Sequence, residues 1–328
     1  MRIAMIGFGT VGQGIASVLM RKDLGLTITA IADSRSGLMR DDGVDLAGVL
    51  ERKRGGFVVG DVGISPMDVV KRGEYDLLVE VSPTNIQTAE PAATFIREAI
   101  SRGKHVVSSN KGPIALHLKE LRRAALSHGV QLRYEATVCG AIPIMHVLEE
   151  GLRGNSVKSL HGVLNGTSNF ILTRMAEEGL TYDQALAEAR EMGVAEADPT
   201  YDVKGIDAAI KLVILSNTIW ETDLRLEDVV VTGIDQITPD AIRLSEDEDA
   251  TIRLIAEAIP ERGICRVTPR LIPRNHPLVV NGTLNAITLT TDLAGALTFV
   301  GKGAGSIETA SAVIGDILHI KERYARGA

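Results

Sequence analysis

The stretch Gly7-Phe8-Gly9-Thr10-Val11-Gly12 decides the fold of this chain of 328 residues. It follows an apolar run, Ile3–Phe8, that is typical of a buried strand, and it opens a helical pattern from Val11 to Arg21. A glycine-rich turn between a first strand and a helix is the setting of a dinucleotide site, because small residues let the backbone approach a pyrophosphate and the helix amides face its charge. The sequence therefore predicts cofactor contacts at Gly7, Gly9, Thr10, Val11 and Gly12, the alternative being a tight turn that binds nothing.

Strand and helix patterns alternate through residues 1–134, which indicates βαβ units and a doubly wound, Rossmann-type parallel sheet. Strands are expected at Ile3–Phe8, Leu26–Ala32, Leu77–Val81, His105–Val107 and Val130–Tyr134, and helices at Val11–Arg21, Thr88–Ser101 and Pro113–His128. Ligands bind such sheets beyond the carboxyl ends of the strands. Pro83, Thr84 and Lys111 are therefore expected at the cofactor, although Lys111 also fits a surface lysine near a helix start.

The choice between NAD and NADP depends on the end of the second strand. Asp33 lies 21 positions beyond Gly12 and is placed to hold a ribose 2′-hydroxyl, as in NAD sites. Ser34 and Arg35 follow it and suit a 2′-phosphate, and the basic run Arg52-Lys53-Arg54 adds positive charge. We expect all of Asp33, Ser34 and Arg35 to contact the cofactor, with NADP favoured over NAD.

The composition excludes several classes of protein. The chain has 42 acidic and 35 basic residues and a formal net charge of −7, which argues against binding the nucleic-acid backbone. Two cysteines, Cys139 and Cys265, cannot form a disulfide framework or a four-thiolate zinc site, and they favour a reducing compartment. No apolar run approaches the roughly 18 residues of a membrane span. We therefore expect a cytoplasmic protein that binds neither nucleic acid nor membrane.

Residues 135–300 are predicted to form an α+β domain on a mixed sheet. A helix is expected from about Ile142, then a strand at Lys158–Leu164 and two or three helices through Trp220. Later strands are expected at Ile264–Ile272, Leu284–Thr291 and Ala296–Val300, and the acidic Leu244–Asp249 is interpreted as a solvated connection.

Residues 301–328 are predicted to return to the first domain as a helix from about Ser306. The glycine loop before this helix would bring Gly303 and Gly305 to the cofactor, unless the loop is only a connection between sheet and helix.

The segment from Glu196 to Lys211 carries the strongest chemical signal in the second domain. Asp207 and Lys211 are four residues apart and therefore share one helical face. Such pairs are common on helix surfaces, where they contribute only a few tenths of a kcal/mol. Here the neighbouring positions are apolar nearly all round, so the helix should be buried, and charges kept in a buried helix indicate chemistry.

Six segments together resemble homoserine dehydrogenase. They are GFGTVGQG from Gly7, SSNKGPIA from Ser108, YEATVCGAIPI from Tyr134, LNGTSNFIL from Leu164, EADPTYDVKGIDAAIKL from Glu196 and GKGAGSIETASAVIGDIL from Gly301. The resemblance implies reversible NAD(P)H-dependent reduction of L-aspartate 4-semialdehyde to L-homoserine, in the route to threonine, methionine and isoleucine. It also implies a homodimer. Feedback control by threonine through added kinase or regulatory domains is not expected.

The resemblance also assigns roles to individual residues. Glu196, Asp202, Asp207 and Lys111 would bind substrate, and Lys211 would be the acid–base lysine, unless proton transfer runs through Lys111. A monovalent cation, typically sodium, would be held at Glu135, Val138, Gly140 and Ile142, mostly by backbone carbonyls. The sequence departs from the family pattern at Cys139, Ile210 and Lys302, where the family often has glycine, a polar residue and proline.

Aldehyde reduction requires a group that stabilises negative charge on the oxygen and then donates a proton, and a lysine ammonium does both. Burial would lower the pKa of Lys211 and Asp207 would raise it, so the sequence leaves the net direction open.

The competing interpretations are another nicotinamide enzyme acting on an amino acid and an NADP-binding redox sensor without activity. A phosphorylating semialdehyde dehydrogenase would need a cysteine nucleophile, and the pair Cys139 and His146 is a poor candidate.

Overall fold

The computed structural model describes the chain over residues 1–327, with side chains described up to residue 323. The chain packs into two compact units. Residues 1–140 and the C-terminal segment from Gly305 form the first, and residues 141–304 form the second. The expected boundaries at 134 and 300 followed the ends of strands. The packing boundaries lie a few residues later because the turn after Tyr134 stays bonded to the C-terminal helix, where the Glu135 amide donates to Asp316 at 2.8 Å.

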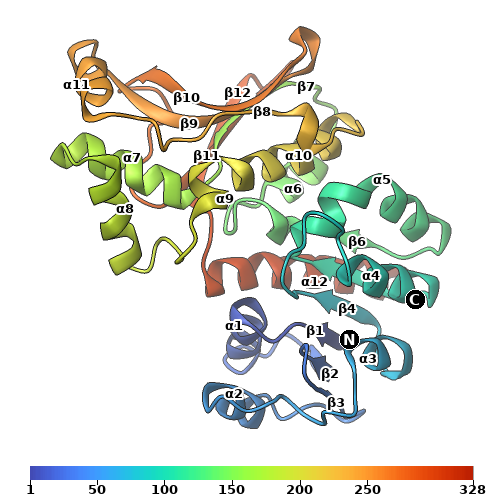
Figure 1. Ribbon diagram of the computed structural model, residues 1–328. Helices are drawn as coiled ribbons and strands as arrows, with labels where there is room; N and C mark the ends of the chain where they lie inside the picture. The colour runs from blue at the N-terminus through green and yellow to red at the C-terminus, as the bar shows by residue number, and fades with distance from the viewer. Residues whose placement is uncertain (328) are drawn as a thin grey trace. The chain divides into compact units, whose positions relative to one another are not determined.

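The first unit is built on a six-stranded sheet, and Figure 1 shows its strands in blue to teal. The strand order is β3-β2-β1-β4-β5-β6, and every neighbouring pair is parallel except β2 with β3. The strands are β1 Arg2–Ile6, β2 Thr27–Ala32, β3 Gly37–Met39, β4 Leu77–Glu80, β5 His105–Ser108 and β6 Leu132–Arg133. The predicted parallel sheet is confirmed, except at its edge, where the short strand β3 was not predicted and is antiparallel to β2.

Helices cover both faces of this sheet, as its strand pattern requires. Ile3 and Met5 belong to one apolar core with α1, α2 and the C-terminal helix α12, while Ala4 and Ile6 belong to another with α3, α4 and α5. Successive side chains of a strand point to opposite faces, so a strand buried on both sides is apolar throughout. The helices are α1 Thr10–Leu19, α2 Leu46–Arg54, α3 Pro66–Arg72, α4 Ala92–Ser101, α5 Lys111–Ser127 and α12 Ser306–Gly327, with a 3₁₀ turn η1 at Glu135–Thr137.

The C-terminal helix α12 returns to the first unit, which confirms the prediction. It packs against α1, and Figure 1 shows it in red beside the blue and teal elements. Ser306 at its start donates to the Thr10 carbonyl at 2.8 Å, and Lys321 donates to the Leu24 carbonyl at 2.7 Å. Between them, the buried Asp316 carboxylate pairs with Arg133 of β6 at 2.8 Å. These contacts join the last helix to the start of α1, to the loop before β2 and to strand β6.

The second unit is an α+β fold on a mixed sheet of order β12-β11-β7-β9-β10-β8, in which only β10 and β8 are parallel neighbours. Helices α7, α10 and α11 pack on this sheet. The strands are β7 Val157–Val163, β8 Val230–Val231, β9 Ala250–Ile259, β10 Ile264–Pro273, β11 Leu284–Thr291 and β12 Ala296–Lys302. The helices are α6 Ile144–His146, a π-helical turn η2 Val147–Gly151, α7 Gly166–Glu178, α8 Tyr182–Glu191, α9 Thr200–Val203, α10 Ile206–Trp220 and α11 Pro239–Asp247, with 3₁₀ turns η3 Leu226–Asp228 and η4 Pro260–Arg262.

Several local expectations were wrong. Strand β9 was missed, because Arg253 and Glu257 interrupt its apolar pattern even though both are buried. Helices α2 and α3 were also missed. The acidic Leu244–Asp249 is solvated as expected, but its first four residues continue helix α11 instead of forming a connection. Helix α4 begins at Ala92, four residues later than Thr88, because the Asn85 side chain first accepts the Gln87 and Thr88 amides in a turn.

Candidate active site

The glycine turn of the first unit has the geometry of an anion cradle. Gly7 has φ +101°, and a Cβ there would lie 2.4 Å from the Val81 carbonyl oxygen. A Cβ at Gly12 would lie 2.4 Å from the Gly7 carbonyl oxygen, so only glycine fits at either position. A Cβ at Gly9 would meet nothing within 4 Å, and no side chain caps helix α1 there. There is thus open space beside Gly9, and the uncapped first turn of α1 suits a pyrophosphate group.

Asp33 lies at the end of β2 and is paired with a lysine. Its Oδ2 accepts from Lys53 Nζ of α2 at 2.6 Å, and its Oδ1 accepts from the Arg35 and Ser36 amides at 2.9 and 3.0 Å. Burial raises the pKa of Asp33, but the Lys53 and backbone hydrogen bonds outweigh it and hold the pKa below its usual value. Ser34 and Arg35 are exposed next to this pair. The Lys53 ammonium thus adds a second positive side chain, besides Arg35, next to the residues expected to hold a 2′-phosphate.

The loops after β4 and β5 are tied together by Asn110. Its side chain donates to the carbonyls of Ser82 and Pro83 at 3.2 and 3.3 Å. The same side chain caps α5 by accepting the Gly112 amide at 3.1 Å. Since Gly7 also packs against Val81, the first unit brings the glycine turn, the loop that contains Pro83 and Thr84, and the start of α5 to one edge of its sheet.

Glu80 lies at the centre of this edge and was missed by sequence reasoning. It is fully buried at the end of β4, accepts the Ser82 amide at 3.0 Å and the Ser82 hydroxyl, and accepts from Ser108 Oγ at 3.3 Å. Burial raises the pKa of Glu80 to about 7, against the opposing effect of these hydrogen bonds. The sequence signal that could have indicated Glu80 is an acidic residue at the end of an apolar strand, directly before a loop expected at the cofactor.

Replacing Glu80 by glutamine should therefore remove a pH dependence of stability. A carboxyl whose pKa is raised on folding binds more protons when folded than when unfolded, so wild-type stability should fall as pH rises from about 4.5 to about 7. Glu80→Gln keeps the shape and stays neutral. We expect it to match the wild type near pH 4 and to exceed it by roughly 1–3 kcal/mol at pH 8. Urea denaturation at both pH values measures this, and an equal difference at both would contradict the shifted pKa.

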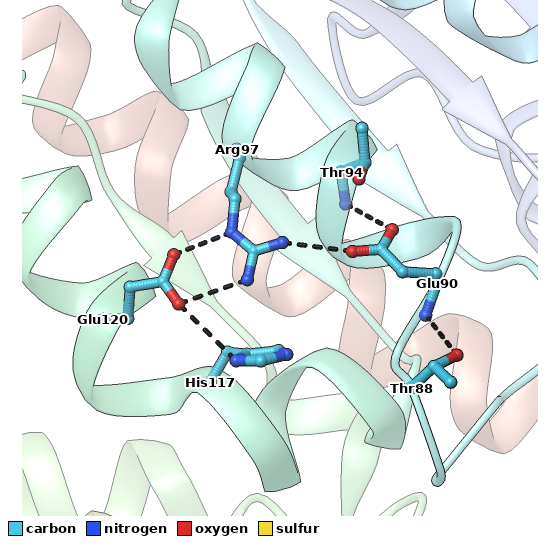
Figure 2. Close-up of polar contacts among 6 residues, drawn as sticks. All are labelled: Thr88, Glu90, Thr94, Arg97, His117 and Glu120. Carbon is cyan, nitrogen blue, oxygen red and sulfur yellow. Dashed lines mark hydrogen bonds and ion pairs between the residues drawn. The ribbon is translucent and has the colours of Figure 1, made fainter.

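Lys111 is the first residue of α5, two residues before the expected start at Pro113. It is half-buried, and the helix that bears it is kinked at His117, whose φ is −134°. Beyond the kink, α5 is joined to α4 by an ion-pair cluster (Figure 2): Arg97 donates to both oxygens of Glu120 at 2.7 and 3.1 Å and to Glu90 at 3.2 Å. The ion pairs thus hold the part of α5 beyond the kink against α4. The first turn of α5, which contains Lys111, is held instead by the Asn110 cap.

The second unit brings Lys211 into a buried polar cluster on α10. Lys211 is 7% exposed, and its Nζ lies 2.7 Å from Asp207 Oδ2 and donates to the Leu164 carbonyl at 2.7 Å. Asn165 Nδ2 donates to Asp207 Oδ2 at 3.0 Å and to Asp202 Oδ1 at 2.6 Å. Asp207, Lys211 and Asp202, expected from the sequence, are therefore brought together by Asn165, which was not expected.

Asn165 was overlooked because its role depends on tertiary contact. Its Oδ1 caps α7 by accepting the Ser168 amide at 2.8 Å, which leaves its amide nitrogen for the two carboxylates. Burial raises the pKa of Asp202, and the nearby Asp207 charge adds to that rise. The only sequence signal for Asn165 was its position as a helix-capping residue directly before Gly166, where α7 begins. The Gly166 and Thr167 amides lie in the first turn of α7.

Glu196 is not part of this cluster. It is exposed in the connection between α8 and α9, and no hydrogen bond or ion pair joins it to another side chain in the part of the chain that the structure describes. Its expected contact with substrate stays a prediction.

The turn expected to hold a cation is buried and tightly wound. Glu135 is 1% exposed at the start of η1, and Cys139 and Gly140 have successive positive φ values of +53° and +48°. Gly140 is the last residue of the first unit's N-terminal segment, so Glu135, Val138 and Gly140 belong to the first unit, whereas Ile142 belongs to the second. Among the described residues, no three or more His, Cys, Asp or Glu side chains gather as a metal site. The sequence resemblance implies a cation held here mostly by backbone carbonyls, and this stays a prediction.

The two glycines of the last loop belong to different units. Gly305, with φ +137°, directly precedes α12 in the first unit. Gly303 belongs to the second unit, where it packs closely on Asn285 of β11. Gly305 lies beside α1, through the neighbouring bond from Ser306 to Thr10, and the cofactor contact expected of Gly303 stays a prediction.

Neither cysteine has the setting of a nucleophile. Cys139 is fully buried, and burial raises the pKa of the Cys265 thiol to about 11. A phosphorylating dehydrogenase needs an accessible thiolate, so this alternative loses its support. In residues 1–327, no helix is both long and apolar enough to cross a membrane.

The chain is similar to homoserine dehydrogenases over nearly its whole length. Residues 7–135 match the homoserine dehydrogenase NAD-binding domain, and residues 143–318 match the homoserine dehydrogenase family. The homoserine dehydrogenase of Methanocaldococcus jannaschii is 44% identical, with 98% of each chain covered. The NAD(+)-dependent homoserine dehydrogenase of Pseudomonas canavaninivorans is 37% identical, with 99% of this chain and 97% of the relative covered.

The fold is also similar to that of a solved homoserine dehydrogenase structure. A hyperthermophilic archaeal homoserine dehydrogenase in complex with NADPH aligns with a TM-score of 0.84 at 30% identity, covering 98% of each chain. The first unit is thus an NAD(P)-binding domain. The chain belongs to the homoserine dehydrogenase family of NAD(P)-dependent oxidoreductases.

Proposed function

We propose that Lys211 is the proton donor when this chain reduces L-aspartate 4-semialdehyde to L-homoserine, and that NADPH is the preferred reductant. The observation that carries the proposal is the buried cluster of Lys211, Asp207, Asn165 and Asp202. Buried charges are retained at a cost in stability, and such clusters are concentrated at functional sites.

Reduction of the aldehyde requires a hydride and a proton, and the chain itself has to supply only the proton. When bound, the reduced nicotinamide supplies the hydride. Lys211 Nζ donates to the Leu164 carbonyl and pairs with Asp207. In the reaction, the Lys211 ammonium stabilises the negative charge that develops on the substrate oxygen and then donates a proton to it. Asp207 favours the charged form of Lys211 before transfer.

Substrate orientation follows from the remaining acidic groups. The substrate carries an ammonium group, for which Asp202 supplies a charge-assisted hydrogen bond. Asn165 holds Asp202 and Asp207 in place through one amide group. Glu196 and Lys111 are retained as further substrate contacts. The first amides of α7 are suited to the substrate carboxylate.

The preference for NADPH is proposed from the charges around Asp33. Lys53 neutralises the carboxylate that would otherwise repel a 2′-phosphate, and Arg35 and Ser34 are exposed beside it. A relative that is NAD(+)-dependent and another bound to NADPH show that the family uses both cofactors.

Arg35→Ala should raise the KM for NADPH by about 10-fold and leave the KM for NADH unchanged, because only NADPH carries the 2′-phosphate. Arg54→Ala is the matched control, since Arg54 is an exposed arginine of the same basic run. Initial-rate kinetics with both cofactors provide the measurement. Equal effects of Arg35→Ala on NADPH and NADH would remove the argument for NADP.

A monovalent cation at the turn after Tyr134 is part of the proposal. The buried Glu135 carboxylate and the carbonyls of a tightly wound turn are oxygen ligands, which suit a hard cation such as sodium. Exchanging sodium chloride for tetramethylammonium chloride at equal ionic strength should lower the thermal unfolding temperature. No change would argue against an occupied site.

Reduction itself is tested by mixing the chain with NADPH and L-aspartate 4-semialdehyde and following absorbance of the reduced nicotinamide. Turnover with homoserine as product supports the proposal. NADPH binding without turnover would instead favour the redox-sensor alternative. The homodimer and the cytoplasmic location expected from the sequence stay predictions, and light scattering tests the first.

A further inference from the structure

A cavity of about 390 Å³ lies in the second unit and shares no residue with the Lys211 cluster. Helices α7 and α11, strand β9, the residue after β10 and the connection before β11 form its walls. It is lined by Thr173, Ala176, Glu177, Glu246, Thr251, Arg253, Arg274, Val279 and Asn281. Its size is at the lower end of the roughly 300–1,000 Å³ of small-molecule sites.

Arg253 of β9 is the most unusual lining residue. It is 3% exposed, yet every group that accepts from it is neutral: Thr251 Oγ1 at 2.8 Å, the Ile252 carbonyl at 2.9 Å, Asn281 Oδ1 at 3.0 Å and the Val280 carbonyl at 3.4 Å. No carboxylate of the described residues forms an ion pair with it, and burial lowers its pKa to about 10 against the opposing charge of nearby Glu177. Burying a guanidinium without a directly bonded carboxylate is costly, so an anionic group in the cavity would be favoured at Arg253.

The guanidinium also has a donor left for such an anion. Arginine has five N–H groups, and the four bonds described above use one on Nε, two on Nη1 and one on Nη2. One Nη2 hydrogen remains, on a side chain that lines the cavity.

The cavity wall carries balanced charges. Arg274 pairs with Glu246 at 2.9 Å, and both side chains are well exposed. Glu177 is exposed and accepts from the Asn281 amide at 3.0 Å. Two arginines and two glutamates thus face one small space. A simple anion would be repelled by the glutamates and a simple cation by the arginines, whereas a molecule with both charges satisfies both pairs.

We propose that this cavity binds a small zwitterionic α-amino acid, with its carboxylate at Arg253 and Arg274 and its ammonium at Glu177 and Glu246. A guanidinium matches a carboxylate in geometry, and charge-assisted bonds at both ends orient the molecule. The site goes beyond the proposed reduction and does not depend on it, since binding is measured without turnover.

Isothermal titration calorimetry with glycine, L-alanine, L-serine and L-valine tests the proposal on the intact chain. We expect heat of binding from at least one of them, and at least about 10-fold weaker binding of acetate and of methylammonium, which each carry one charge. Absence of binding by all four amino acids would overturn the proposal. Acetate binding as tightly as glycine would show a plain anion site and would overturn it as well.

Matched variants place the binding in this cavity. Glu177→Gln and Arg274→Gln should each weaken amino-acid binding by at least about 10-fold, with kcat and KM for the semialdehyde unchanged. Glu178→Gln and Arg243→Gln are the controls, because these neighbours pair instead with Arg174 and Asp240. Both lie outside the cavity lining. Unchanged binding in Glu177→Gln and Arg274→Gln would place the amino acid elsewhere and overturn the proposal.

Discussion

Replacing Lys211 by methionine is expected to lower kcat for semialdehyde reduction by at least about 100-fold. Methionine keeps the length of the side chain in its buried position but can neither stabilise an alkoxide nor donate a proton. The loss should appear in kcat, because the ammonium matters most when negative charge develops on the oxygen. Binding of NADPH, followed by its fluorescence, should be unchanged, since none of the expected cofactor contacts is altered.

Lys204→Met is the matched control. Lys204 lies seven residues earlier, is exposed and pairs with Asp235 at 2.8 Å. Its loss should leave kcat within about twofold of the wild type, as is usual for surface changes. A near-wild-type rate in Lys211→Met would eliminate Lys211 as the proton donor.

The same assay with Lys111→Met separates the two lysines. If Lys111 also handles charge at the substrate oxygen, this variant should lose at least about 100-fold in kcat as well. Lys119→Met changes an exposed lysine of the same helix and should not. A normal rate in Lys111→Met would leave proton transfer to Lys211 alone.

Asp316→Ala is expected to lower the free energy of unfolding by about 3–5 kcal/mol. Asp316 is 1% exposed, pairs with the buried Arg133 at 2.8 Å and accepts the Glu135 amide at 2.8 Å. The alanine variant leaves a buried guanidinium without that partner and a buried amide without its acceptor. Urea denaturation followed by circular dichroism measures the change.

A double variant makes this prediction sharper. Arg133→Met with Asp316→Leu removes both charges and refills the space, so it should recover most of the lost stability. Asp240→Ala breaks the exposed pair with Arg243 and should change stability by less than about 1 kcal/mol. If Asp316→Ala were no worse than Asp240→Ala, the ion pair would not be what holds α12 to the first unit.

Much of the fold followed from local pattern. The glycine turn predicted the parallel sheet and its cofactor edge, because only glycine satisfies the positive φ at Gly7 and the close approaches at Gly7 and Gly12. Asp207 and Lys211 could be paired from the sequence, since residues four apart meet on any helix. The apolar residues around them correctly indicated that the helix would be buried.

What the sequence could not supply depends on contacts between distant segments. Strand β9 was missed because Arg253 and Glu257 look like surface residues until their partners on other segments are known. Glu80 and Asn165 each act through neighbours brought by other strands or helices.

The amino-acid sequence by itself thus determined the family, the first sheet and the helix that bears Lys211. Only the tertiary structure decided which polar side chains are buried and what each one faces. The physical reason is that backbone propensity and periodicity act over a few residues, whereas the burial of a charge and the choice of its partner are fixed by packing between segments as far apart as Asn165 and Asp207.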